Sequence, residues 1–193
     1  METQDINNLM EVVVAQRLEQ ADKNTPYYLL DITKRAGHEI FAYQVAYVVD
    51  QLFSFDGITA FGFDFEHEYN DEGGTYLSVT GHLTYTFPDE GEETAIIYSH
   101  DDADINADLI EQWDEDEQSR FEYVVGLVSN LIESIDESEL NQAYSFYETT
   151  FKKGTPFEAY RKKFPETMSI IEKYFIEQNI DVSQKDHRGI YKM

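Results

Sequence analysis

The side chains of this sequence with the greatest capacity for chemistry are carboxylates, and most of them lie in one region. Residues 36–151 hold 27 Asp and Glu and a single basic residue, Arg120, which gives the region a net charge of −26. The whole chain carries −25, because residues 152–193 are mildly basic. Carboxylates in this number can bind metal ions, transfer protons or oppose the basic surface of a partner. Their grouping decides between these roles.

Two groups of carboxylates have a regular spacing or a high local density. The first alternates with phenylalanines along residues 61–68, so its members stand about 6.7 Å apart on one face of a strand. Taken alone, such a row is more typical of a solvated strand face. The second consists of nine acids in the seventeen residues from Asp101 to Glu117. The candidate partner-binding residues are Asp64, Glu66, Glu68, Asp101, Asp102, Asp104, Asp114, Glu115, Asp116 and Glu117.

The second group does not form a calcium loop of the EF-hand type. Asp102, Asp104 and Asn106 stand at positions 1, 3 and 5 of such a loop. Position 6 is Ala107, where glycine is needed, and position 12 is Trp113, where a bidentate glutamate is needed. Weak calcium binding by these acids remains open. We expect no dedicated metal site and no cofactor.

The sequence also contains no recognisable catalytic constellation. Cysteine is absent, which excludes thiolate catalysis, disulfides and Cys-based zinc sites. There is no Gly-rich phosphate loop, no nucleophile elbow and no HExxH spacing. Strand alternation places His82 with the Ser and Thr side chains and His67 with the phenylalanines, so these histidines are not expected to share a site. We therefore expect a protein that is not an enzyme and has no catalytic residues.

The apolar pattern predicts an α+β fold. Between about residues 58 and 100, apolar and polar residues alternate in three runs separated by turn segments, which predicts a three-stranded antiparallel meander. N-terminal and C-terminal helices are expected to pack on one face of this sheet. Helical spacing, a capping box and Pro165 predict helices over about 5–22, 38–54, 117–135, 140–151, 155–164 and 165–178. Thr25 and Pro26 are typical of another helix start, with Gly37 as its possible stop, although residues 27–35 could instead be extended.

Charge divides the chain into an acidic α+β domain, residues 1–151, and a mildly basic helical extension, residues 152–193. The extension is expected to pack on the same domain. The N-terminus has no basic segment and only the short apolar run 12–15, so we expect neither a signal peptide nor a membrane span. Anionic lipid would also repel the chain. The expected location is the cytoplasm.

The regional acidity predicts a basic protein partner. Duplex DNA carries one charge per ~1.7 Å, so about 24 phosphates occupy the ~40 Å diameter of a domain of this size. The acidic region matches that density only if most of its carboxylates share a surface. In charge and size the chain resembles the phage and mobile-element proteins that block restriction or CRISPR nucleases by imitating DNA. This resemblance implies a stoichiometric inhibitor that occupies the basic groove of a DNA- or RNA-processing enzyme.

Other interpretations fit the same charge. The protein could be an immunity protein or a chaperone that covers a basic toxin or effector, or its acidity could be an adaptation to high salt. Basic residues between 152 and 163 could in principle contact nucleic acid directly. We do not expect this, because the neighbouring aromatic residues have the spacing of a helix core and the chain as a whole would repel phosphates. The oligomeric state is not indicated.

Overall fold

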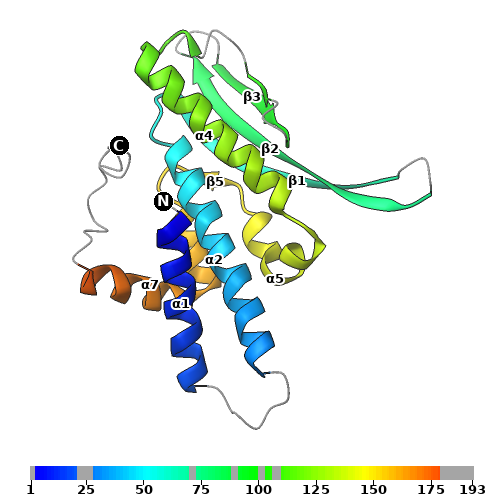
Figure 1. The fold of residues 1–193 in the computed structure, drawn as a ribbon. Coiled ribbons are helices and arrows are strands. Elements are labelled where there is room, and N and C mark those ends of the chain that lie inside the picture. The colour runs from blue at the N-terminus through cyan, green and yellow to red at the C-terminus, as the bar shows by residue number, and fades with distance from the viewer. Residues whose placement is uncertain are drawn as a thin grey trace. The chain divides into compact units, whose positions relative to one another are not determined.

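The structure is a computed structural model that describes residues 3–20, 28–69, 73–87, 91–99, 103–105 and 110–178 (Figure 1). The chain forms two compact units: one comprises residues 1–44 and 160–193, and the other residues 45–159. The boundaries therefore fall within helices α2 (Tyr28–Leu52) and α6 (Pro156–Lys163). The division predicted at residue 151 is based on charge, whereas these two units are defined by contacts within the fold. The division by charge therefore stays a prediction.

The first unit is built from helices. Helix α1 (Thr3–Gln20) packs against α7 (Pro165–Glu177) and lies beside the first part of α2 (Tyr28–Leu52) (Figure 1). The predicted helix at 5–22 is thus confirmed with slightly earlier bounds. Buried apolar residues at helical spacing form the interior of this unit. They include Leu9, Val13, Ala36, Ile40, Tyr43, Tyr160, Met168 and Ile171.

The expectation that Gly37 stops a helix is wrong. Helix α2 runs through this position without interruption, and the nearest side-chain atom to a Cβ built there would be Met10 Cε at 3.8 Å. Glycine inside a helix costs about 1 kcal/mol relative to alanine. The buried positions Ala36, Ile40 and Tyr43 flank Gly37 on the same helix, and their packing outweighs that cost.

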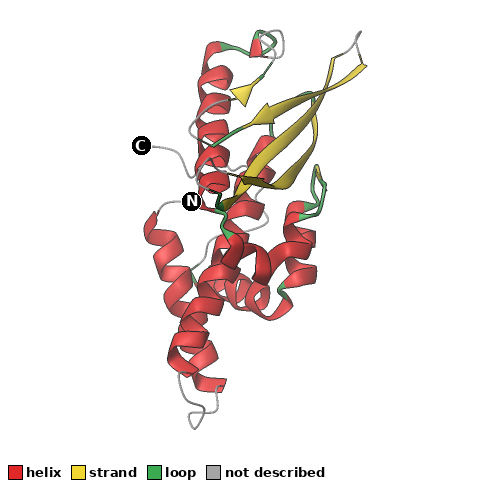
Figure 2. Cartoon of the chain, turned by 90° about the vertical axis from the view of Figure 1, so that its right-hand side faces the viewer, coloured by secondary structure: helices red, strands yellow, loops and turns green. Residues whose placement is uncertain are grey.

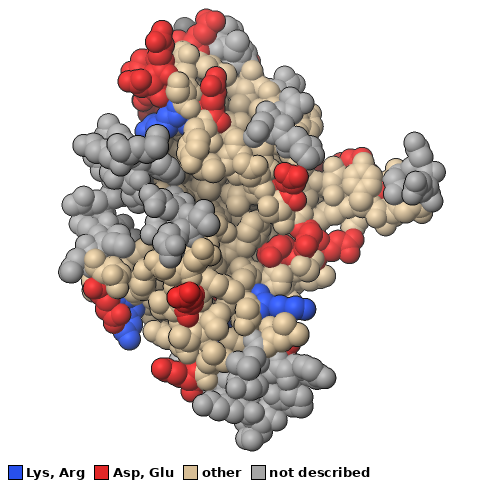
Figure 3. Space-filling model, in the orientation of Figure 1, with Lys and Arg blue, Asp and Glu red and all other residues tan. Residues whose placement is uncertain are grey.

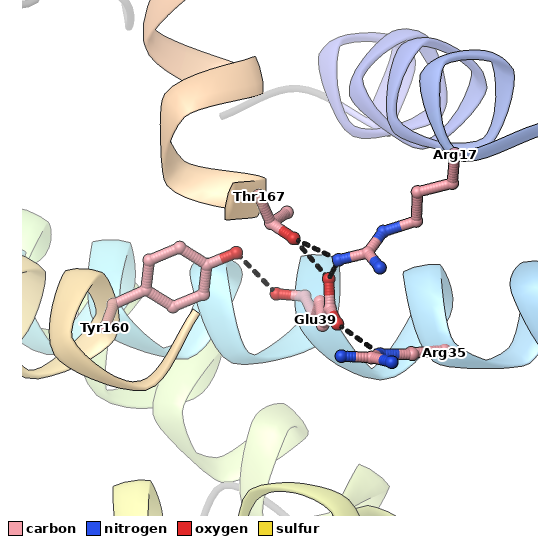
Figure 4. Close-up of polar contacts among 5 residues, drawn as sticks. All are labelled: Arg17, Arg35, Glu39, Tyr160 and Thr167. Atoms are coloured by element: carbon pink, nitrogen blue, oxygen red, sulfur yellow. Dashed lines mark hydrogen bonds and ion pairs between the residues drawn. The ribbon is translucent and has the colours of Figure 1, made fainter. Parts of the chain in front are cut away.

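A buried carboxylate connects three helices of the first unit. Glu39 on α2 is only 3% exposed, and it forms an ion pair with Arg17 of α1 and another, at 3.0 Å, with Arg35 (Figure 4). The hydroxyl of Thr167 on α7 also donates a hydrogen bond to the Glu39 carboxylate. Tyr160 Oη donates to the main-chain oxygen of Glu39 at 2.9 Å. Glu39, the one buried carboxylate among the described residues, is therefore engaged by two basic groups and a hydroxyl group.

The second unit contains the sheet, which confirms the predicted α+β meander. Its strands follow the order β4-β3-β2-β1-β5, and every pair is antiparallel (Figure 2). The three long strands are those expected from the alternation, and two strands of two residues each extend the sheet at its edges. The strands are β1 (Ile58–Tyr69), β2 (Thr75–Phe87), β3 (Gly91–Ile97), β4 (Ala103–Asp104) and β5 (Phe151–Lys152).

Helix α4 (Glu115–Ser134) covers one face of this sheet, over β2 and β3 (Figure 1). Ser129 Oγ fixes it there by donating to the main-chain oxygen of Tyr98 at 2.5 Å. Helix α5 (Glu137–Tyr147) follows, and α6 (Pro156–Lys163) begins at the expected proline. The predicted helices are confirmed with two differences. Residues 28–36 are continuous with the helix expected over 38–54, and the helix expected over 140–151 ends at Tyr147, because Phe151 joins the sheet as part of β5.

Gly81 allows helix α4 and strand β1 to approach β2 closely. A Cβ at this position would lie 2.9 Å from the ring of Phe61 and 3.2 Å from Ile132 of α4. Phe61, Leu83 and Ile132 are all buried, so their side chains have little room to move away. The phenylalanine face of the sheet is thus the face that packs against the helices.

The one basic residue of the acidic region has a structural position. The guanidinium of Arg120 on α4 lies 4.4 Å from the centre of the Phe55 ring. Phe55 also contacts Trp113 and Phe121, with ring centres 5.3 and 5.1 Å away. A guanidinium over an aromatic face gains about 0.5–2 kcal/mol. Arg120 therefore stacks on the aromatic cluster that anchors the start of α4.

Candidate partner-binding surface

Strands β1 and β2 continue beyond the rest of the sheet as a two-stranded ribbon (Figure 1, Figure 2). On the outer side of β1, strand β5 reaches only Ala60 and Phe61, and on the outer side of β2, strand β3 reaches only as far as Gly81. Residues 64–69 pair with residues 75–80, and neither stretch pairs with any other described strand. We call these two stretches the arm.

The carboxylates predicted on the first strand form a row along one face of the arm. Asp64, Glu66 and Glu68, which we call the acidic row, are all exposed. The phenylalanines lie on the opposite face, where the ring of Phe63 is 5.0 Å from that of Phe61 and 6.2 Å from that of Phe65. The alternation inferred from the sequence is therefore present in the structure.

Strand β2 places hydroxyl and imidazole groups beside the acidic row. Tyr76 Oη donates a hydrogen bond to Glu68 Oε2 at 2.6 Å, and His82 Nε2 lies 3.8 Å from Asp64 Oδ2. The bonds from Tyr76 and, second, from Ser78 lower the pKa of Glu68, while the bond to Glu68 raises the pKa of Tyr76. The sequence analysis missed Tyr76, although its alternation with Leu77 places it on the polar face.

Replacing Tyr76 by phenylalanine is expected to raise the pKa of Glu68 toward the ordinary glutamate value. The Tyr76 hydroxyl favours the charged carboxylate, so its loss removes the largest cause of the lowered pKa. The measurement is an NMR titration of the side-chain carboxyl carbon of Glu68. Tyr144→Phe on α5 is the matched control, because Tyr144 bonds Glu148 instead and should leave Glu68 unchanged. An identical Glu68 titration in Tyr76→Phe would show that the contact does not form in solution.

The acids at residues 114–117 have a role in the fold. Asp114 is the N-cap of α4, and its Oδ1 accepts a hydrogen bond from the Glu117 main-chain N–H at 2.9 Å. Glu115, Asp116 and Glu117 occupy the first turn and are exposed. Negative charge at a helix N-terminus is stabilising. Part of this cluster is thus explained by the start of the helix, independently of any partner.

The remaining predicted residues, Asp101, Asp102 and Asp104, lie within or next to a stretch that the structure does not describe. Asp101 and Asp102 lie outside the described residues. Asp104 ends β4, where it pairs with Ile96, and only its main chain is described. Their contribution to a binding surface stays a prediction, as does any weak calcium binding by this segment.

The described acids do not merge into one continuous surface on the face that Figure 3 shows. One group lies at the start of α4 and another where α4 passes into α5, and uncharged surface separates them (Figure 3). The acidic row belongs to the sheet face opposite the phenylalanines, on which α4 does not pack. The acidic region as a whole is therefore not expected to match the charge density of DNA over one surface. The arm, with its acidic row, is the narrower candidate for the partner-binding surface.

The described part of the chain contains no group of three or more His, Asp or Glu placed to hold a metal ion. A shallow, mainly apolar groove of about 550 Å³ follows α4 and is lined in part by Phe121, Glu122 and Asn130. No helix among the described residues has the length and apolar character needed to cross a membrane.

Comparison with known proteins assigns no relative to this architecture. The chain matches no protein-family model, no curated protein and no solved structure at a significant level.

Proposed function

We propose that this protein is a stoichiometric inhibitor that imitates nucleic acid and occupies the basic groove of a DNA- or RNA-processing enzyme of the restriction or CRISPR nuclease type. The observation that supports this most directly is the acidic row, three exposed carboxylates on a ribbon that extends beyond its sheet. The sequence has no Lys or Arg from residue 36 to residue 119, so no lysine or arginine of β1, β2 or β3 offsets this charge.

The spacing of the acidic row supports imitation of a phosphate backbone. Alternate residues of a strand stand about 6.7 Å apart. One strand of duplex DNA carries a phosphate every ~3.4 Å of axis, and its rotation of about 36° per base pair separates neighbouring phosphates by roughly 7 Å through space. A row of lysine or arginine side chains that tracks consecutive phosphates can therefore meet Asp64, Glu66 and Glu68 in the same register.

A long-range field would add to this contact. Net charge of −26 over residues 36–151 attracts a basic protein before contact and speeds association, especially at low salt. The same field repels nucleic acid, so the proposed partner is a basic nucleic-acid-binding protein and not DNA or RNA. The proposal requires no catalytic residue and no cofactor, and it places the protein in the cytoplasm, where such enzymes act.

The proposal is tested by using the protein as bait in a lysate of its native host and eluting along a salt gradient. Two charge-reversal variants serve as matched baits. The first carries Glu66→Lys and Glu68→Lys in the acidic row, and the second carries Glu11→Lys and Glu19→Lys at exposed positions of α1. Both change the net charge equally. Asp114 is left intact because it caps α4.

We expect the wild-type bait to capture a nuclease or another nucleic-acid enzyme that duplex DNA or RNA displaces. The acidic-row variant should bind that enzyme at least about 100-fold more weakly, and the α1 variant should bind nearly as well as wild type. Circular dichroism confirms that each variant is folded. Equal binding by the acidic-row variant would refute the proposal, and capture of one basic protein that nucleic acid cannot displace would favour an immunity or chaperone function.

A further inference from the structure

The arm has an open strand edge beside the acidic row. Along β1, pairing with β5 ends at Phe61, and no other described strand lies on that side of residues 62–69. Strand edges with unpaired N–H and C=O groups can accept an additional strand. A two-stranded ribbon is also marginally stable without further partners, so a third strand would stabilise the arm.

One hydrogen bond and the strand pairing indicate which main-chain groups face this edge. Asp64 Oδ1 accepts a hydrogen bond from the main-chain N–H of Phe65 at 2.9 Å. Successive residues of an antiparallel strand direct these groups to opposite sides. Phe61 pairs with β5 on the outer side, and the pairing of β1 with β2 is regular from Ala60 to Tyr69. The N–H groups of Phe65, His67 and Tyr69 therefore face outward.

The two faces of β1 determine which side chains an added strand would need on each of its own faces. Residues opposite Asp64, Glu66 and Glu68 would come within about 5 Å of the acidic row, which favours Lys or Arg. The alternate residues would lie beside the aromatic face, where Phe65 is half-buried against Tyr144 of α5. Tyr69, on that same face, is exposed. A second copy of this edge is disfavoured as the occupant, because it would bring carboxylates against carboxylates.

We propose that the outer edge of β1, from Asp64 to Tyr69, binds an extended segment of a partner protein as an additional β-strand, in which basic and apolar residues alternate. This inference rests on the proposed function in one respect, the basic character of the partner. Main-chain hydrogen bonds supply affinity in such binding, and the alternating side chains supply specificity. The carboxylate of Asp64, which covers the Phe65 N–H, is displaced toward the incoming basic residue.

The test uses the full-length protein and two labelled peptides of about eight residues, the length of a typical strand. One alternates lysine with valine, and the other has the same composition with all lysines preceding all valines. Binding is measured by fluorescence anisotropy. His67→Pro removes an outward N–H and blocks the edge without touching the ladder to β2. Thr75→Pro, which alters the opposite edge of the arm, is the matched control.

We expect the alternating peptide to bind at least about tenfold more tightly than the peptide in which all lysines precede all valines. His67→Pro should abolish that difference, and Thr75→Pro should preserve it. In the wild-type complex, hydrogen exchange should slow at the amides of Phe65, His67 and Tyr69. Equal binding of the two peptides, no detectable binding of either, or an unchanged preference in His67→Pro would each overturn the inference.

The outcome is separable from that of the proposed function. If His67→Pro removes peptide binding while the Glu66→Lys, Glu68→Lys bait captures its enzyme normally, the strand-binding edge stands and nucleic-acid imitation fails. If the peptides show no preference while the charge-reversed bait loses its enzyme, imitation stands and strand addition fails.

Discussion

Replacing Glu39 by alanine is expected to lower the free energy of unfolding by about 3–5 kcal/mol. The side chain of Arg17 is only 14% exposed, and without Glu39 its charge would be left in the interior without the carboxylate that it pairs with. The Thr167 hydroxyl would lose its acceptor as well (Figure 4). Urea unfolding followed by circular dichroism measures the effect, because the elements joined by Glu39 are helices.

The matched control for Glu39→Ala is Arg35→Ala. Arg35 contacts the same carboxylate from one helical turn away, but its side chain is 65% exposed. Because the Arg35 side chain stays largely in water, its pair with Glu39 is expected to contribute only about 0.5 kcal/mol. If both substitutions destabilised the protein equally, the effect would come from charge alone and the buried network would not be its cause.

Replacing Phe61 by alanine is expected to cost about 3–5 kcal/mol, the second large effect. Phe61 is fully buried, contacts Phe63, and fills the space that Gly81 leaves between β2 and α4. Phe65, four residues further along the same strand face, is only half-buried. Its replacement by alanine should cost about 1 kcal/mol. The midpoint of urea unfolding gives both values.

The same pair of variants separates the core from the contact surface. Phe65→Ala should leave the fold intact and weaken binding of the alternating lysine–valine peptide, because Phe65 lies on the aromatic face of the arm beside the open edge. A Phe65→Ala protein as unstable as Phe61→Ala would place the arm within the core of its unit. It would then be unsuited to serve as an independent contact surface.

The acids of this protein serve different physical purposes although the sequence presents them as one field. Glu39 lies inside the first unit, Asp114 and its neighbours start α4, and the acidic row faces solvent from the arm. Reversing charge indiscriminately would therefore confuse folding with binding. Glu66 and Glu68 are the most informative positions for functional tests, because both are exposed and neither caps a helix.

Local patterns predicted most of the secondary structure. The alternation of phenylalanines with acids at 61–68 defined β1 and its two faces, because side chains of a strand point to opposite sides at every step. The apolar stripe through Val124, Val128 and Ile132 likewise defined α4. The prediction at Gly37 is wrong because the free energy that a glycine costs a helix is smaller than the free energy gained from packing partners. Those partners lie far away in the chain, so a local pattern does not contain them.

Which side chains lie next to one another depends on contacts between residues that are far apart in the chain. Pairing of β1 with β2 brings Tyr76 to Glu68, and folding of the first unit brings Arg17 and Thr167 to Glu39. The length of β5 decides where the edge of β1 becomes open. Periodicity in a sequence reports how each segment presents its own side chains to a surface. The free energy of the assembled fold determines the register of β1 with β2, the burial of Glu39 and the residue at which pairing with β5 ends. Only the three-dimensional structure could therefore reveal these features.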